Sequence, residues 1–267
     1  MMKPRISVAI ATFNEEKNIT ECLESVKDLA DEIVVVDGSS TDKTVEIAEK
    51  YGAKVIVTEN PPIFHINKQK AIDECKGEWI LQLDADERVT PELKKEIKSE
   101  IRNPKSEINA YFIPRKNYFL GRWLKKTGQY PDGVIRFFKK GKAKLPCKSV
   151  HEQMKVEGKV GWFKGHLLHY PYPSFSEYLK KSNRYTTLAA QEMLEKGKKP
   201  SFFGYFFAEW QAIKTFLLLF IRHKGFMDGF PGFVFSLYSG LHHISAYVKF
   251  WELYQQKRKI DIKKDWE

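Results

Sequence analysis

Cysteine is scarce in this chain of 267 residues, which contains only three. Cys22, Cys75 and Cys147 are an odd number, and no two of them have CxxC spacing. Disulfide frameworks and zinc sites need more cysteines at paired spacings, so neither is indicated. We therefore expect free thiols in a reduced, cytosolic setting.

Long hydrophobic runs are also missing. The N-terminal segment MMKPRISVAIATFNEE has an apolar run too short for the core of a signal peptide. The most apolar part of the chain, from about residue 200 onward, is interrupted by Glu209 and Lys214, whereas a spanning helix needs about 20 residues with few charges. We expect no spanning helix and a location on the cytoplasmic side of the membrane.

Acidic residues are outnumbered, with 34 Asp and Glu against 45 Lys and Arg, and the resulting charge of +11 favours an anionic partner. Nucleic acid, an acidic lipid surface and phosphorylated substrates all qualify. A nucleic-acid-binding protein should interleave basic and aromatic residues on one face. Here acids cluster at predicted strand ends, where they would repel a phosphate backbone, so we expect no nucleic-acid partner.

Strands and helices alternate over the first hundred residues. The pattern predicts strands at 6–11, 32–36, 54–58 and 79–83, with helices at 18–29, 44–51, 66–75 and 93–101. Such alternation predicts an α/β fold with a largely parallel sheet covered by helices on both faces. Shorter strands at 111–114, 133–138 and 156–161 make the sheet mixed. We expect a catalytic domain at 1–198 and an aromatic-rich helical extension at 199–267.

Polar residues directly follow three of these strands. They are Thr12–Glu15, Asp37–Asp42 and Asp84–Asp86, and ligands bind at such carboxyl ends in doubly wound sheets. Asp84 and Asp86 would point to the same side of an extended chain, where both can hold a divalent cation. An isolated DxD is more often a solvated acidic turn. At the end of a buried strand, beside two other polar strand ends, a cation that bridges a diphosphate is the favoured interpretation.

Three segments, VAIATFNEE, IVVVDGSSTDKT and KGEWILQLDADE, resemble the family-2 inverting glycosyltransferases of the GT-A fold. The resemblance implies a UDP-sugar donor and Mg²⁺ or Mn²⁺. It also implies a nucleotide pocket lined by Thr12, Asn14 and Glu15, with Asp37 on uracil or ribose. Asp84 and Asp86 would hold the diphosphate, Asp86 chiefly through the metal.

Lys68 lies in a segment, Asn67-Lys68-Gln69, that resembles a Gln-Arg-Asn element of a subgroup but differs from it at all three positions. Its cation could meet a phosphate. The alternative is a plain surface helix start.

The second half of the chain resembles the stretch YPD…RxF…VHE…H of lipopolysaccharide core glucosyltransferase-like members. Inverting transfer needs a general base to deprotonate the acceptor hydroxyl, for which we prefer Glu152 and hold Asp132 in reserve. Arg136 could clamp the diphosphate or form a structural ion pair. His169 could complete the metal shell with Asp84 and Asp86 or bind a phosphate oxygen, or it could be a hydrogen-bonded structural histidine. His151 is a weaker candidate for such a role.

The C-terminal extension carries one apolar stripe on a helical projection. Its members are Phe203, Phe206, Phe207, Trp210, Ile213, Leu217, Phe220 and Ile221. With the basic residues that flank it, this stripe predicts an amphipathic segment lying on an anionic membrane surface. The alternative is a packing arm buried on the catalytic domain or a second subunit.

The resemblance as a whole implies transfer of a hexose, glucose from UDP-glucose, onto a lipid-linked saccharide such as the lipopolysaccharide inner core. The transfer would be a single displacement with a metal-stabilised UDP leaving group, catalysed by a protein peripheral on the inner face of the cell membrane. A polyprenyl-phosphate sugar synthase is the alternative enzyme. Those relatives usually carry clear transmembrane helices or end soon after the catalytic domain.

Overall fold

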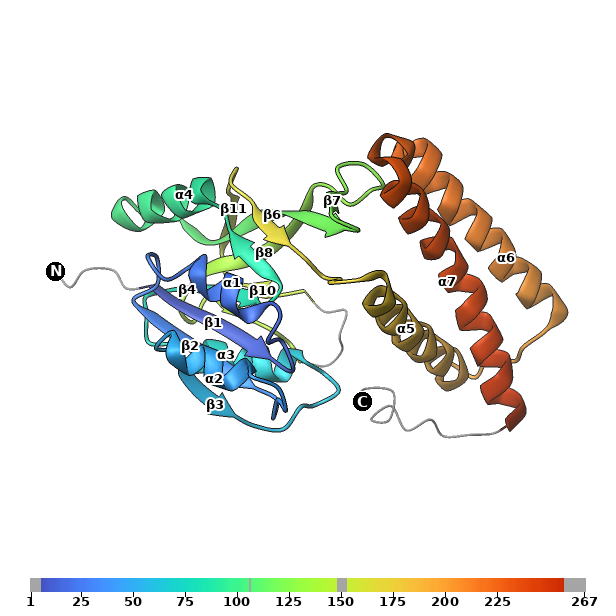
Figure 1. Ribbon diagram of the computed structural model, residues 1–267, viewed down its shortest axis with the longest axis horizontal. Coiled ribbons are helices and arrows are strands. Elements are labelled where there is room, and N and C mark those ends of the chain that lie inside the picture. The colour runs from blue at the N-terminus through green and yellow to red at the C-terminus, as the bar shows by residue number, and fades with distance from the viewer. Residues whose placement is uncertain (1–5, 106, 148–152, 257–267) are drawn as a thin grey trace. The chain divides into compact units, whose positions relative to one another are not determined.

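The computed structural model describes residues 6–105, 107–147 and 153–256. The chain divides into two compact units, one of Met1–Arg115 with Pro131–His169 and the other of Lys116–Tyr130 with Tyr170–Glu267. Strands dominate the first unit and helices the second (Figure 1). The helix α5 (Phe175–Glu195) belongs to the second unit. The division into a catalytic domain and an extension after residue 198 stays a prediction.

Four parallel strands form one side of the sheet in the order β3-β2-β1-β4. They are β1 (Ile6–Thr12), β2 (Glu32–Asp37), β3 (Lys54–Val57) and β4 (Trp79–Asp84). Successive side chains of β1 point to opposite faces of the sheet, with the period of two expected of strands. Val8 and Ile10 pack into one core cluster, while Ala9 between them packs into the other. Apolar side chains on both faces explain why these strands are nearly continuous hydrophobic runs.

The sheet continues from β4 through strands that arrive later in the chain. Antiparallel β8 (Asp132–Lys139) pairs with β4, and β6 (Ile108–Phe119) pairs antiparallel with β8. Further along lie β12 (Leu167–His169) and β5 (Glu87–Val89), which are antiparallel to each other. The predicted α/β class, with a mixed, mostly parallel sheet flanked by helices, is confirmed.

Short strands complete the sheet structure. β11 (Lys159–Trp162) runs parallel to β6, and β7 (Arg122–Trp123) pairs with the end of β6. A separate two-stranded piece is made by β9 (Ala143–Lys144) and β10 (Lys155–Val156).

Helices cover both faces of the sheet. Helices α1 (Ile19–Glu24) and α4 (Pro91–Arg102) contribute apolar side chains to the first core cluster, and α3 (His65–Glu74) contributes to the second. Helix α2 (Thr44–Lys50) lies against α1. At the start of α4, Thr90 Oγ1 accepts the N–H of Leu93 at 3.3 Å and so caps the helix.

The second unit is built around α7 (Gly229–Gln256), which packs against α5 and α6 (Phe202–Leu217). A π-helical turn, η1 (Leu218–Arg222), and a 3₁₀ turn, η2 (Gly225–Asp228), join α6 to α7. Gly240 allows the close approach of α6, because a Cβ there would lie 2.6 Å from the carbonyl oxygen of Ala212. Within the described ranges, no helix is both long and apolar enough to cross a bilayer.

Candidate functional site

Asp37 ends β2 and is completely buried beneath the loop that follows it. Its Oδ2 accepts hydrogen bonds from the hydroxyls of Thr12 at 2.8 Å and Ser40 at 2.6 Å. Its Oδ1 accepts the Ser40 N–H at 2.7 Å. Thr12 is the partner of Asp37 in the β1–β2 register, which explains their proximity. The carboxylate therefore organises the loop, and its contact with uracil or ribose stays a prediction.

Asn14 and Glu15 tie the loop after β1 to the loop after β2. The Asn14 N–H donates to Ser40 Oγ at 2.8 Å, and Asn14 Oδ1 accepts the Thr41 N–H at 2.8 Å. The Glu15 N–H donates to Thr44 Oγ1 at 2.8 Å. Asn14 has φ of 53°, in the left-handed region that Asn adopts more readily than most residues. The predicted nucleotide-binding residues thus form one hydrogen-bonded rim at the carboxyl edge of the parallel strands.

Asp84, the last residue of β4, lies between two cations. Its Oδ1 is 2.5 Å from Lys68 Nζ, and its Oδ2 is 2.6 Å from Arg136 Nη2. Lys68 comes from α3 and Arg136 from β8, and both side chains are largely buried. Lys68 is therefore a largely buried partner of Asp84, unlike a plain surface helix start. Arg136 forms the ion pair that the sequence left as an alternative to a diphosphate clamp.

The positive charges of Arg136 and Lys68 keep the carboxylate of Asp84 ionised. Burial alone would raise the pKa of Asp84, but Arg136 and Lys68 outweigh it and hold that pKa well below its usual value of 3.8. Burial would lower the pKa of Arg136, but Asp84 and Glu87 raise it above its usual value. Asp84 is consequently a carboxylate neutralised by two protein cations.

Glu87 and Arg115 complete the ion network, and the sequence analysis singled out neither. Glu87 is fully buried. Its Oε1 accepts from Arg136 at 2.8 Å and Arg115 at 3.2 Å, and its Oε2 accepts the Asp84 N–H at 3.0 Å. The acidic run Asp84-Ala85-Asp86-Glu87 was a signal for Glu87. No local signal marked Arg115, which lies within the long strand β6.

Asp86 and His169 face each other, with Asp86 Oδ2 3.6 Å from His169 Nε2 and both side chains largely buried. Strand pairing produces this contact, because β12 places His169 opposite Glu87, the residue next to Asp86. A carboxylate oxygen and an imidazole nitrogen at this separation can ligate one divalent cation.

The donor set suits a cation that is shared with a substrate. In the part of the chain that the structure describes, no group of three or more His, Cys, Asp or Glu side chains could hold a metal. Mg²⁺, however, is usually bound through one or two carboxylates, with substrate phosphates and water filling the remaining positions. Asp86 supplies one such carboxylate beside the nitrogen of His169, whereas the oxygens of Asp84 already contact Lys68 and Arg136.

Of the two candidate bases, Glu152 and Asp132, the structure describes only Asp132. Glu152, like His151, falls outside the described residues. Asp132 begins β8 and pairs with Arg115 across the β6–β8 ladder. Its Oδ2 accepts two hydrogen bonds from Arg115, at 2.6 Å from Nη2 and 3.0 Å from Nε. One oxygen of Asp132 is therefore committed to a guanidinium group.

Known proteins are similar to this chain over most of its length. The model of the family described as Glycosyl transferase family 2 matches residues 7–155. The lipopolysaccharide core biosynthesis glycosyltransferase LpsC of Rhizobium meliloti (strain 1021) is 29% identical, and the match covers 96% of each chain. An uncharacterized glycosyltransferase of Rickettsia typhi is 30% identical over 96% of this chain and 90% of its own. Among solved structures, S. aureus TarS 1-349 in complex with UDP-GlcNAc has a TM-score of 0.47 and 18% identity, covering 95% of this chain and 92% of its own.

Proposed function

The chain belongs to glycosyl transferase family 2, and on that premise we propose that it transfers a hexose from a UDP-sugar to a lipid-linked saccharide. Membership of the family confirms the resemblance drawn from the sequence. The observation that carries the proposal is the Asp86–His169 pair, 3.6 Å apart, next to the doubly paired Asp84 at the end of β4. This edge of an open α/β sheet is where nucleotides bind.

The donor is divided between two parts of the site. The rim formed by Thr12, Asn14 and Glu15, supported by Asp37, receives the nucleoside. Lys68 and Arg136 both contact Asp84 here, so either would reach a diphosphate only by leaving that carboxylate.

Asp86 and His169 would hold Mg²⁺ or Mn²⁺. Asp84 joins this ligand set only by exchanging one of its two cations for the metal. When bound, the metal neutralises the charge that develops on the UDP leaving group.

The acceptor hydroxyl attacks the sugar from the face opposite the diphosphate, so the transfer inverts the anomeric carbon and needs a base on that side. We assign Glu152 this role and keep Asp132 in reserve. The hydrogen bonds from Arg115 to Asp132 Oδ2 support that order, because they occupy an oxygen that a base would use to accept the proton.

The proposed acceptor rests on the similarity to LpsC, and the proposed location rests on an exposed face of the second unit. Similarity to LpsC, a lipopolysaccharide core biosynthesis glycosyltransferase, supports a lipopolysaccharide core saccharide as the acceptor class. Glucose, which the sequence resemblance implies, is the hexose to test first. We define the α6 aromatic face by side chains that are between 48% and 84% exposed, namely Phe203, Phe206, Phe207, Trp210, Ile213, Leu217 and Ile221.

Such a face, followed by Arg222 and Lys224, supports peripheral binding to an anionic membrane, on its cytoplasmic side.

The test is UDP release from a panel of UDP-hexoses, with a lipopolysaccharide core acceptor and with or without Mn²⁺, on wild type and Asp86→Ala. We expect metal-dependent turnover that Asp86→Ala lowers by about 100-fold or more, since a catalytic metal stabilises the transition state by several kcal/mol. Turnover that needs no metal and survives Asp86→Ala would remove the proposed metal site. Turnover with polyprenyl phosphate alone would change the acceptor class.

A further inference from the structure

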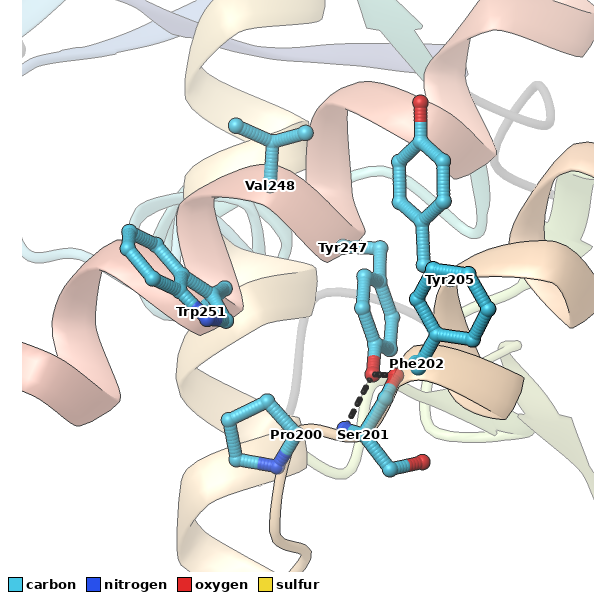
Figure 2. A pocket seen from close by; sticks show the side chains of 7 residues that line it. All are labelled: Pro200, Ser201, Phe202, Tyr205, Tyr247, Val248 and Trp251. Carbon is cyan, nitrogen blue, oxygen red and sulfur yellow. Dashed lines mark hydrogen bonds between the residues drawn. The ribbon is translucent and has the colours of Figure 1, made fainter.

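A pocket of about 490 Å³ lies in the second unit, between the start of α6 and the last turns of α7. Figure 2 shows the rings of Phe202 and Tyr205 coming from α6 and the side chains of Tyr247, Val248 and Trp251 from α7. Pro200 and Ser201, just before α6, complete the lining. The volume lies within the roughly 300–1,000 Å³ typical of small-molecule sites. None of the site residues discussed above contributes to it.

The serine and tyrosine groups of this lining are already engaged by the protein. The Tyr247 hydroxyl donates to the Ser201 carbonyl at 2.7 Å and accepts the Ser201 N–H at 2.8 Å, as Figure 2 shows. Ser201 Oγ accepts the Gly204 N–H at 3.0 Å as the cap of α6. The Tyr205 hydroxyl bonds to Glu209. The pocket consequently presents mostly ring and aliphatic carbon to an occupant.

The architecture holds this apolar lining in place. A Cβ on Gly204 would lie 2.4 Å from the Tyr247 hydroxyl, so the glycine lets that ring pack directly against α6. Phe250 and Leu253, on the same helix as Tyr247, are buried against α5 residues such as Ala190. The part of α7 that lines the pocket is therefore held in place by its packing against α5 and α6.

Positive charge and exposed aromatic surface adjoin the pocket. Lys198 and Lys199 are exposed and immediately precede Pro200, the first residue of the lining. On the other side, Phe202 is 73% exposed and directly precedes Phe203 of the α6 aromatic face. A molecule with one apolar chain and one anionic head would therefore match both the carbon-lined pocket and the adjacent lysines.

We propose that this pocket binds one hydrocarbon chain of an anionic membrane lipid, with the lipid head near Lys198 and Lys199. The site differs from the α6 aromatic face as a whole, because it accepts a single chain in a defined cavity, whereas an interfacial helix contacts many lipids without selection. Binding here does not depend on the assignment of donor, metal or base.

The experiment is calorimetric titration of the full chain with decyl phosphate below its micelle-forming concentration, compared with butyl phosphate. We expect saturable binding of one decyl phosphate, with affinity rising by up to about fourfold for each added methylene that the pocket buries. Val248→Trp should weaken binding by about tenfold or more, because the larger ring occupies the pocket. Val248 is half exposed, so the change does not disturb the core.

Leu241→Trp is the matched control, since Leu241 is an exposed aliphatic residue on the same helix that does not line the pocket. It should bind decyl phosphate as the wild type does. Lys198→Gln with Lys199→Gln should weaken decyl phosphate binding but leave binding of 1-decanol unchanged. Equal affinity for butyl and decyl phosphate, or equal effects of Val248→Trp and Leu241→Trp, would overturn the proposal.

Discussion

Nη2 of Arg136 lies 2.6 Å from Oδ2 of Asp84, and this contact joins β8 to the carboxyl end of β4. It makes Asp84 part of a buried ion network before any substrate is bound. The carboxylate that opens the DxD sequence therefore has a structural role that can be measured without an activity assay.

The ion network should make stability depend on pH through Asp84. The folded-state pKa of Asp84 is depressed, so its contribution is present above the unfolded value of 3.8 and is lost as pH falls through the folded pKa. At about pH 7, Asp84→Asn should lower the free energy of unfolding by about 1–3 kcal/mol, since two buried cations lose their counter-charge. The deficit should shrink below about pH 4.

Urea unfolding followed by circular dichroism, at about pH 7 and again below about pH 4, checks this dependence. Asp28→Asn, at an exposed aspartate, is the control and should stay within about 0.5 kcal/mol of wild type. A deficit of the same size at both pH values would show that Asp84 does not act through its charge.

The pairing of Asp86 with His169 should appear directly in metal binding. Asp86→Asn and His169→Gln should each weaken Mn²⁺ binding in the presence of UDP by about 10-fold to 100-fold, because each removes one of the two ligands that we propose. Electron paramagnetic resonance of free Mn²⁺ measures this without turnover. Asp28→Asn again serves as the control, and unchanged affinity in both site variants would place the metal elsewhere.

Two variants test whether Glu152 or Asp132 is the general base. Glu152→Gln should reduce transfer by about 100-fold to 10,000-fold while UDP binding stays nearly intact, because a general base acts only on the acceptor. Asp132→Asn should retain more activity. If instead Asp132→Asn abolishes transfer and Glu152→Gln does not, Asp132 is the base. Single-turnover rates and UDP titrations on each variant supply the comparison.

The α6 aromatic face should be required for membrane association. Phe203→Glu with Phe207→Glu places two carboxylates on it, so flotation with phosphatidylglycerol vesicles should fall to near background. Val57→Glu is the matched control, since Val57 is a similarly exposed apolar residue of the first unit. Flotation of the double variant at the wild-type level would contradict membrane binding through this face.

Local pattern was sufficient for most of the sheet. The strands β1 and β4 lie where periodicity placed them. Helix α5 went unpredicted although its start carries a local signal, Ser174 followed three residues later by Glu177. In the structure Ser174 Oγ accepts the Glu177 N–H at 3.2 Å.

The amino-acid sequence by itself determined the α/β order, the family resemblance and the polar residues at three strand ends, because these depend on neighbours along the chain. Only the tertiary structure decided what those residues contact. Strand β8 returns antiparallel beside β4 and brings Arg136 to Asp84, and β12 pairs with β5 and brings His169 to Asp86. Such register between distant strands is set by the packing of the whole sheet, which no local pattern encodes.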